Sequence, residues 1–155
     1  MVEGGAISRF VRAGLATGVT DGLFSSALAA FVYGSTVTRL WQGVASVLLG
    51  AAAFDGGMRA AATGVLMHFG VAFGWSAVFL LLVLSSSWIR GVLASPYGVI
   101  AVATVYGPLI WIVMSLAVLP MLTHRPPTIN IRWWVQLVGH CPFVGLPIVA
   151  LIGRP

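Results

Sequence analysis

The sequence predicts an all-α integral membrane protein, a bundle of four transmembrane helices with one additional short helix. Of its 155 residues, 59% are hydrophobic and only 7% are charged. A soluble domain carries about a quarter charged residues, so this composition could not give a water-covered surface. Several apolar stretches also have the ~20 residues that cross a ~30 Å hydrocarbon core. We therefore expect one transmembrane domain over residues 1–155.

The four expected spans cover residues 10–34, 58–86, 97–122 and 131–152. The first has Arg9 and Arg12 at its start, before an apolar run, and resembles a signal peptide, but we expect it to stay as a span. Pro120 should end the third span, because proline cannot continue a helix ladder. The pair Trp133-Trp134 opens the fourth span, as is typical of the aromatic belt at a membrane interface.

Residues 40–54 predict a short helix between the first two spans. Fifteen residues extend only ~22 Å as a helix, which is less than the ~30 Å hydrocarbon core. The segment is therefore either re-entrant or an amphipathic helix at the membrane surface. Asp55 follows it and is placed to cap the next span.

Small residues recur at four-residue spacing within three spans and predict close helix packing. In lipid, such spacing lets two backbones approach each other. In the second span this face includes His68, so that side chain should point towards another helix. The residues expected at packing contacts are Gly14, Gly18, Gly22, Gly64, Ala72 and Gly107.

Three ionisable side chains lie inside the expected spans: Asp21, His68 and His140. Such groups are costly in lipid and should face protein or water, which makes them candidates for function. Asp21 has possible partners in Thr17, Ser25 or another helix, and Gln136 shares a helix face with His140. One interpretation is a polar network that includes Asp21 and Gln136 and serves packing.

The other interpretation of the two histidines is cofactor binding. His68 and His140 lie ten and nine residues into parallel spans, so their depths differ by about one residue rise, ~1.5 Å. Two imidazoles at one depth could be the axial ligands of a haem or another tetrapyrrole. We prefer the packing interpretation, because parallel helices in contact leave little room for a macrocycle.

The residues argue against several other classes of function. The chain has no zinc-protease helix motif, no serine-hydrolase elbow and no phosphate loop, so we expect no enzyme. Cys141 is its only cysteine, and no metal site is expected. The eight arginines lie scattered near span ends, which does not indicate nucleic-acid binding.

The arginines divide evenly between the two sides of the membrane and so do not decide the orientation. We expect both termini in the cytoplasm of a bacterial inner membrane, because the first helix often sets orientation.

Four sequence segments resemble a group of small four-span bacterial membrane proteins with no established activity. They are LWQGVASVLLGAAAFDGG, HFGVAFG, YGPLIWIVMSLAVLP and GHCPFVGLPIVAL, all between Leu40 and Leu151. The strongest pieces are Gln42 to Gly57 and His140 to Ile148. The resemblance implies the bundle with its short extra helix, and His68 and His140 match the group's pattern. It implies no substrate.

The excess of small-residue faces favours a non-catalytic accessory subunit within a larger membrane assembly, such as a respiratory or photosynthetic electron-transfer complex. Its partners would be the lipid bilayer and other membrane subunits, or further copies of the same chain. The alternative is a small haem- or pigment-binding membrane protein that uses His68 and His140. A third possibility is a proton-coupled transporter or channel in which Asp21 and the histidines relay protons.

Overall fold

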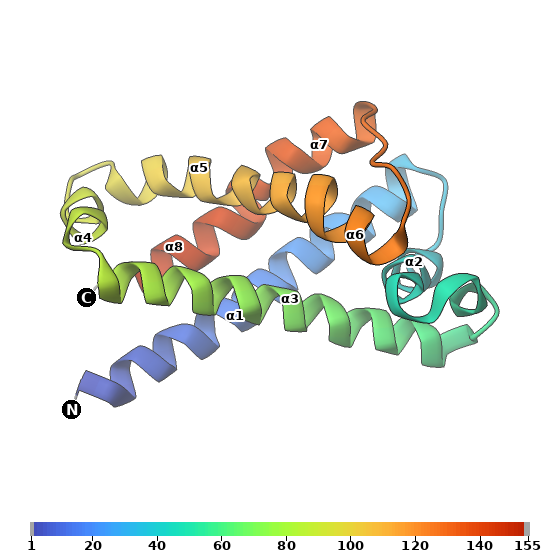
Figure 1. Cartoon of the computed structure of the whole chain (residues 1–155), viewed down its shortest axis with the longest axis horizontal. Coiled ribbons are helices and arrows are strands. Elements are labelled where there is room, and N and C mark those ends of the chain that lie inside the picture. Colours follow the sequence, from blue (N-terminus) through green and yellow to red (C-terminus); the bar gives the residue numbers. More distant parts are fainter. Residues whose placement is uncertain (1, 154–155) are drawn as a thin grey trace.

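The structure is a computed structural model that describes the backbone of residues 2–153 and the side chains of residues 5–153. Over this range the ordered elements are helices, joined by short connections (Figure 1). The all-α prediction is confirmed. The helices are α1 (Val2–Ala27), α2 (Val37–Leu49), α3 (Gly57–Ser85), α4 (Ser87–Leu93), α5 (Gly98–Val113), α6 (Leu119–Thr123), α7 (Ile131–His140) and α8 (Leu146–Ile152).

Several of these helices join into longer ones through irregular turns. A π-helical turn extends α1 to Val32, another joins α5 to α6, and a third joins α7 to α8. A 3₁₀ turn, Gly50–Phe54, extends α2. The resulting helices are Gly5–Val32, Val37–Phe54, Gly57–Ser85, Gly98–Thr123 and Ile131–Ile152, and all five are long and apolar enough to cross a membrane.

The count of four spans is not confirmed, because the second of these five helices also meets the length and hydropathy expected of a span. The other four correspond to the expected segments, and apart from the start of the first their ends differ by at most two residues. The largest difference is the start of the first helix, at Val2 instead of residue 10. The prediction that Pro120 ends the third span is wrong, because the helix continues through this proline to Thr123, with Pro120 in the first turn of α6, where a missing N–H is tolerated. The short helix predicted over residues 40–54 begins earlier, at Val37, where Thr36 accepts a hydrogen bond from the backbone of Arg39 (3.1 Å).

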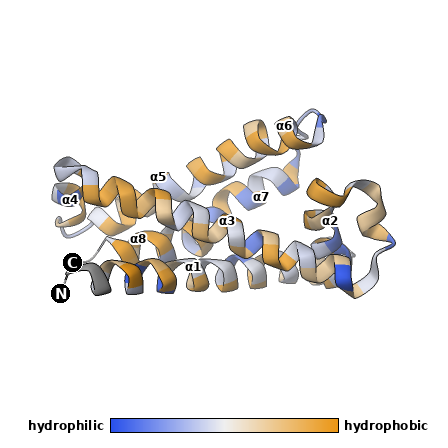
Figure 2. Ribbon diagram, turned by 60° about the horizontal axis from the view of Figure 1, so that its bottom comes forward, coloured by the Kyte–Doolittle hydropathy of each residue, from blue (hydrophilic) through white to orange (hydrophobic). Residues whose placement is uncertain are grey.

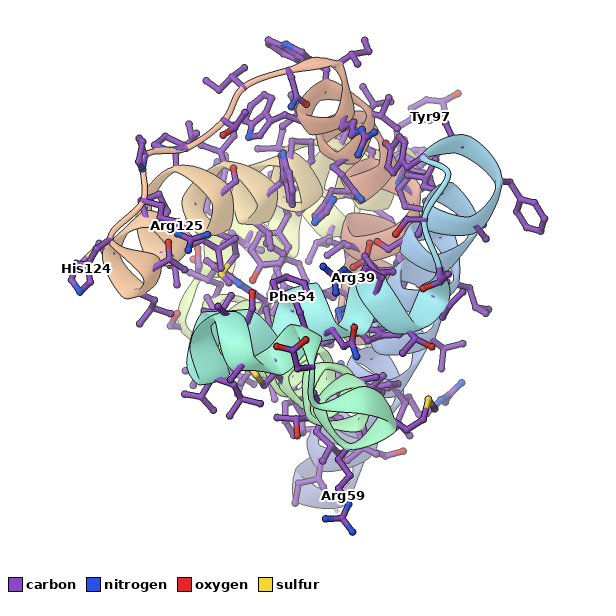
Figure 3. All side chains as sticks on the ribbon, turned by 90° about the vertical axis from the view of Figure 1, so that its right-hand side faces the viewer. Arg39, Phe54, Arg59, Tyr97, His124 and Arg125 are labelled. Carbon is purple, nitrogen blue, oxygen red and sulfur yellow. The ribbon has the colours of Figure 1, made fainter. Side chains whose placement is uncertain are left out.

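The long helices alternate in direction, and both chain ends lie at the same end of the bundle (Figure 1). We call this the terminal end. Helix α2 lies at the opposite end, the α2 end, and Figure 1 views it almost along its own axis while the other helices run across the picture. Seen from that end, α2 crosses in front of the bundle (Figure 3). It therefore runs across the direction of the four long helices.

Helix α2 is held against α3 by a close backbone contact. A Cβ atom on Gly64 would lie 1.9 Å from the carbonyl oxygen of Trp41, so only glycine permits this approach. The buried side chain of Gln42 donates to the carbonyl of Gly57 (3.2 Å). Gly50 ends α2 with a φ of 64°, a conformation that glycine adopts at little cost.

The prediction that Asp55 caps α3 is wrong. The helix begins after Gly56 without a side-chain cap, and Asp55 is exposed. Asp55 instead closes the 3₁₀ turn, where its backbone N–H donates to Ala52 (3.2 Å). Gly56 and Gly57 follow Asp55 and turn the chain, and Gly57 has a φ of 57°. Asp55 therefore lies away from the start of α3.

The main hydrophobic core lies towards the terminal end. Phe79, Val149 and Ile152 are almost completely buried there. The Tyr106 hydroxyl of α5 donates to the carbonyl of Trp75 in α3 (2.8 Å) and joins these two helices. Between α5 and the turn after α7, a Cβ on Gly107 would lie 2.1 Å from the carbonyl oxygen of His140. The helices are thus closely packed at this end.

Prolines inside the spans free carbonyl groups, and side chains of neighbouring helices bond to them. Pro147 has no N–H for the carbonyl of Phe143, and the Thr20 hydroxyl of α1 donates to that oxygen (2.6 Å). The Cys141 thiol lies 3.8 Å from the carbonyl of Thr104, which Pro108 leaves without its helical partner. Because lipid offers no hydrogen bonds, these side chains replace the missing donors.

Hydrophobic residues are frequent along the long helices, with hydrophilic residues scattered among them (Figure 2). Large side chains such as Leu23, Leu66 and Val138 are each about two-thirds or more exposed. In water such a surface would aggregate, whereas in a bilayer it would contact lipid tails. This surface is typical of an integral membrane protein.

Candidate functional site: an intramembrane cavity

A cavity of about 620 Å³ lies between the long helices and extends to the α2 end. Two helices each line it with one stripe of side chains at four-residue spacing, which places them on one helix face. The stripe on α1 and its π-helical turn is Thr17, Asp21, Ser25, Ala29 and Tyr33. The stripe along α7 and α8 is Arg132, Gln136, His140, Val144 and Ile148.

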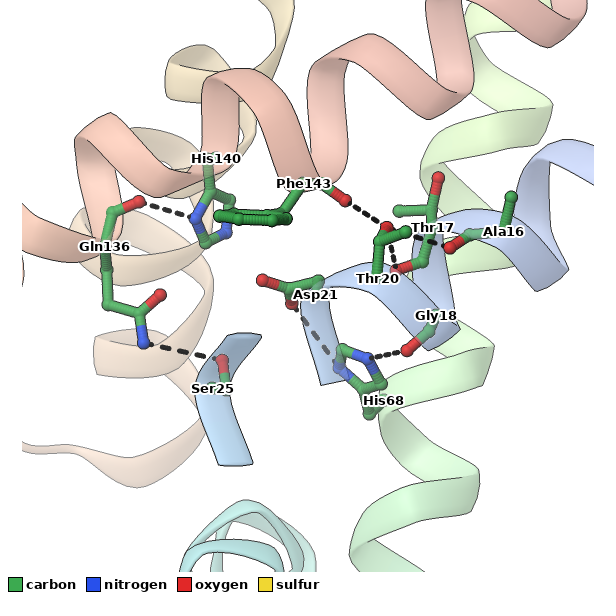
Figure 4. A network of polar contacts seen from close by, with 10 residues as sticks. All are labelled: Ala16, Thr17, Gly18, Thr20, Asp21, Ser25, His68, Gln136, His140 and Phe143. Atoms are coloured by element: carbon green, nitrogen blue, oxygen red, sulfur yellow. Dashed lines mark hydrogen bonds and ion pairs between the residues drawn. The ribbon is translucent and has the colours of Figure 1, made fainter. Parts of the chain in front are cut away.

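The two stripes meet through polar contacts and form what we call the polar wall of the cavity. The Gln136 side-chain amide lies 3.5 Å from the Ser25 hydroxyl. Nearer the α2 end, the Arg132 guanidinium lies over the Tyr33 ring at 4.4 Å. Further inside, Asp21 of α1 lies below the His140 ring (Figure 4). The polar groups of α1 and α7 thus follow one another from the α2 end to the middle of the bundle.

The helices that flank the polar wall contribute an apolar lining. It comes from α2, α3 and the α5–α6 helix: Val44, Val47, Met67, Val71, Ile110, Met114, Val118 and Leu122. A cavity that is mostly apolar and has a few convergent polar groups is the usual form of a small-molecule site.

Asp21 and His68 form an ion-pair contact in this cavity. His68 Nδ1 lies 3.8 Å from Asp21 Oδ2, and its Nε2 lies 3.0 Å from the carbonyl oxygen of Gly18. Since a carbonyl only accepts, Nε2 carries a hydrogen and donates it. In a neutral ring, Nδ1 then presents its lone pair to Asp21. A proton on either group therefore makes the contact attractive.

His140 is oriented by its own helix. Its Nδ1 lies 2.7 Å from the carbonyl oxygen of Gln136, so Nδ1 is the donor and Nε2 is the acceptor of a neutral ring. The ring lies 4.9 Å from that of Trp111, and the His68 ring lies 5.1 Å from that of Trp41. Asp21 lies between the two imidazoles (Figure 4).

Several buried polar atoms of the cavity have no partner within the protein. Within the described side chains, six buried atoms lack one, and all but Ser76 Oγ belong to residues that line the cavity. The five are Thr17 Oγ1, Asp21 Oδ1, Tyr33 OH, Trp111 Nε1 and Gln136 Oε1. Because unpaired buried polar groups are costly, a concentration of them calls for an explanation such as a ligand or water.

The structure brings Asp21, His68, Gln136 and His140 around this one cavity. Asp21 stands between the two histidines, at the place where a flat cofactor with two axial ligands would have to lie (Figure 4). His68 Nε2 is also occupied by Gly18. Among residues 5–153, no three histidine, cysteine or acidic side chains are close enough to hold a metal ion.

The small residues expected at packing contacts lie next to ring or backbone atoms of other elements. Gly14 and Gly18 face Phe73 and Phe69, and Gly22 lies near His68 and Trp41. Gly64 and Gly107 face backbone carbonyls, as described above. Ala72 is buried beside the cavity.

The sequence reasoning missed Tyr33, Trp111 and Arg132 as parts of the site. The four-residue spacing of Thr17, Asp21, Ser25, Ala29 and Tyr33 continues through the predicted span and is a signal that could have found Tyr33. The same spacing links Arg132 to Gln136 and His140. Trp111 gave no such signal, because its relation to His140 depends on how α5 packs against α7.

The chain was compared with protein-family models, with curated proteins and with solved structures, and no match was found. The resemblance to small four-span bacterial membrane proteins therefore stays a prediction. The geometry of the cavity carries the functional argument.

Proposed function

We propose that this protein binds one amphipathic small molecule in the cavity between its helices and catalyses no reaction on it. The observation that carries the proposal is the cavity itself, with five unpartnered polar atoms on its lining and an apolar surface beside them. A ligand with polar groups on one side would supply the missing hydrogen bonds, and its apolar side would contact α2, α3 and α5.

The test is to purify the protein from its native membrane in mild detergent and to identify bound molecules by native mass spectrometry. We expect a stoichiometric adduct that Gln136→Leu weakens, because this change removes the cavity acceptor Gln136 Oε1. His124→Ala is the matched control, since His124 is exposed in the loop after α6. A protein that carries no adduct and acquires none from a native lipid extract would overturn the proposal.

A haem or other tetrapyrrole is a second candidate, favoured by the orientation of His140. Metal-ligating histidines commonly donate their other ring N–H to a backbone carbonyl, as Nδ1 of His140 does to Gln136. We expect such a protein to absorb visible light and to lose the band in His140→Ala. A colourless preparation from cells supplied with haem would exclude this candidate.

The proposal that the chain is a subunit of a larger membrane assembly has its own observation. Gly70 and Gly74 are exposed on α3, four residues apart, with open space where a Cβ would be. Such a pair lets another helix approach closely. This proposal predicts co-purification with partner chains at fixed stoichiometry. A single monodisperse chain in native membranes would contradict it.

For the membrane topology, we propose that the four long helices cross the bilayer and that α2 lies at or near one interface. The direction of α2 across the bundle supports this. We further propose that the membrane is a bacterial inner membrane with both termini on the cytoplasmic side. A reporter enzyme that is active only in the periplasm should be inactive when fused to either terminus. Activity of either fusion would contradict that orientation.

A further inference from the structure

A second cavity of about 320 Å³ opens at the α2 end and shares its inner lining with the first. Tyr33, Trp111, Leu119, Arg132 and Gln136 line both cavities. The smaller one continues towards the loop after α6, where Arg125 lines it. A molecule in the larger cavity could therefore extend to the end of the bundle.

Positive charge gathers where the two cavities meet the end of the bundle. Arg39 lines the larger cavity, Arg125 the smaller one and Arg132 both. Figure 3 shows Arg39 and Arg125 at the α2 end. Among the described side chains, no carboxylate forms an ion pair with these three guanidinium groups.

Two of these arginines are held on aromatic faces. The guanidinium of Arg39 lies 4.2 Å from the Phe54 ring centre, and that of Arg132 lies 4.4 Å from the Tyr33 ring centre. Stacking of this kind orients the planar group. Arg39 Nη1 also donates to the carbonyl oxygen of Phe54 (3.5 Å), whereas the in-plane N–H groups of Arg132 have no such partner among the described residues and are left for an anion. The opening of the cavities is thus suited to bind an anionic group.

The polarity of the lining changes with distance from the arginines. Next to them lie two donors, Tyr33 OH and Trp111 Nε1, and one acceptor, Gln136 Oε1, all without partners inside the protein. The far part of the cavity is lined by Ile110 and Ile148. From the opening inwards, the cavity lining is first positively charged and then carries neutral hydrogen-bonding groups. Its innermost part is formed by apolar side chains together with the Asp21–His68 pair.

The length of the cavity suits a lipid chain. Arg132 and Ile148 both line it and lie sixteen residues apart along one helix, a distance of ~24 Å. One leaflet contributes half of the ~30 Å hydrocarbon core, or ~15 Å. The lining along α7 and α8 is therefore longer than the hydrocarbon part of one leaflet, and it has room for a headgroup at Arg132 and one extended chain.

We propose that the ligand is a single-chain phospholipid, an inference that rests on the proposed function. Its phosphate would bind Arg125 and Arg132, its glycerol linker would meet Tyr33, Trp111 and Gln136, and its chain would extend towards Ile148. Phosphate fits better than a carboxylate because each guanidinium has five N–H donors, while a carboxylate has only two oxygen atoms to accept them.

The experiment compares three probes with the same oleoyl chain on the full-length protein in mild detergent. They are oleoyl-lysophosphatidate, oleate and monooleoylglycerol, and binding is measured by tryptophan fluorescence and native mass spectrometry. We expect the phosphate lipid to bind at least about tenfold more tightly than the neutral lipid, the effect of one charge-assisted hydrogen bond.

Substitution of the arginines tests the position of the phosphate. Arg125→Gln together with Arg132→Gln should abolish the preference for lysophosphatidate over monooleoylglycerol, because both cations assigned to the phosphate are then removed. Arg125→Gln alone should reduce the preference, and it changes an exposed side chain, so the fold is preserved. Arg59→Gln is the control, because Arg59 is exposed at the same end but lines neither cavity (Figure 3).

The outcomes separate this inference from the proposed function. Equal affinity for the phosphate and neutral lipids, or a preference that survives the double substitution, would overturn the phospholipid assignment and leave the amphipathic ligand intact. Oleate that binds as tightly as lysophosphatidate would overturn the choice of phosphate. If none of the three probes binds and no native adduct is found, the proposed function itself fails.

Discussion

The two ends of the bundle are built from the same helices, yet they differ in packing. At the terminal end, α3 and α5 are joined by the Tyr106–Trp75 hydrogen bond and by buried side chains such as Phe79. At the α2 end, side chains of the same two helices, Val71 and Met114, line the cavity instead. One half of the bundle therefore provides stability, and the other holds polar groups that stability alone would not favour.

This difference is typical of proteins that bind ligands, in which functional sites carry unpaired polar groups at some cost in stability. Changes at closely packed contacts between helices should accordingly lower stability, while changes on the cavity lining should affect it little or raise it. The three predictions that follow test this contrast, beginning with the largest expected effect.

Gly107→Ala should strongly destabilise the close contact between α5 and the end of α7. The added Cβ would lie 2.1 Å from the His140 carbonyl oxygen, so α5 and α7 must move apart. We expect a loss of about 3 kcal/mol, at the upper end of the cost of overpacking. The measurement is thermal unfolding of the detergent-solubilised protein. Gly70→Ala is the control, because nothing lies within 4 Å of its added Cβ, and a similar loss there would refute the explanation.

Thr20→Val should cost about 1–2 kcal/mol, because it leaves the Phe143 carbonyl without a donor inside the membrane. The same carbonyl gains a backbone N–H if Pro147 is replaced. Thr20→Val should therefore cost less in a Pro147→Ala background, and a double-mutant cycle in the same unfolding assay measures the difference. Additive effects of the two changes would show that Thr20 does not compensate for Pro147.

Two glutamines give the smallest and most direct comparison. Gln42 is buried at the contact of α2 with α3 and donates to Gly57, whereas Gln136 is part of the cavity lining and its buried Oε1 has no partner. Gln42→Met should destabilise the protein by about 1 kcal/mol through the lost hydrogen bond. Gln136→Met should leave stability unchanged or raise it, since it removes an unsatisfied polar group. If both changes cost the same, the cavity lining is ordinary core.

Much of the fold follows from local sequence. The long apolar segments predict the four long helices, because a helix in lipid must bond its own backbone. Their ends are predicted less well, since the third continues past Pro120 to Thr123 and the first begins at Val2. The prediction that Asp55 caps α3 was wrong because the geometry of this turn depends on Gly56 and Gly57. The number of helices long enough to span was underestimated, because α2 begins at Val37 and its 3₁₀ turn adds length that the apolar run alone did not show.

The candidate site was predictable only in part. Asp21, His68, Gln136 and His140 could be chosen as costly groups in lipid, but their arrangement could not. Equal depth suggested that the two histidines face each other, whereas Asp21 of α1 lies between them (Figure 4). Which helix lies between two others depends on long-range packing, and spacing within one helix carries no information about it.

The central claim is that the α2 end holds a cavity open to small molecules while the terminal end is closed. Ser25→Cys places a thiol on the cavity wall, and Ser76→Cys places one at a fully buried position of α3. Both are made in a Cys141→Ala background, which removes the native cysteine. The measurement is the rate of modification by a small maleimide in the folded protein. We expect rapid reaction at position 25 and none at position 76, and equal protection of both thiols would contradict the account.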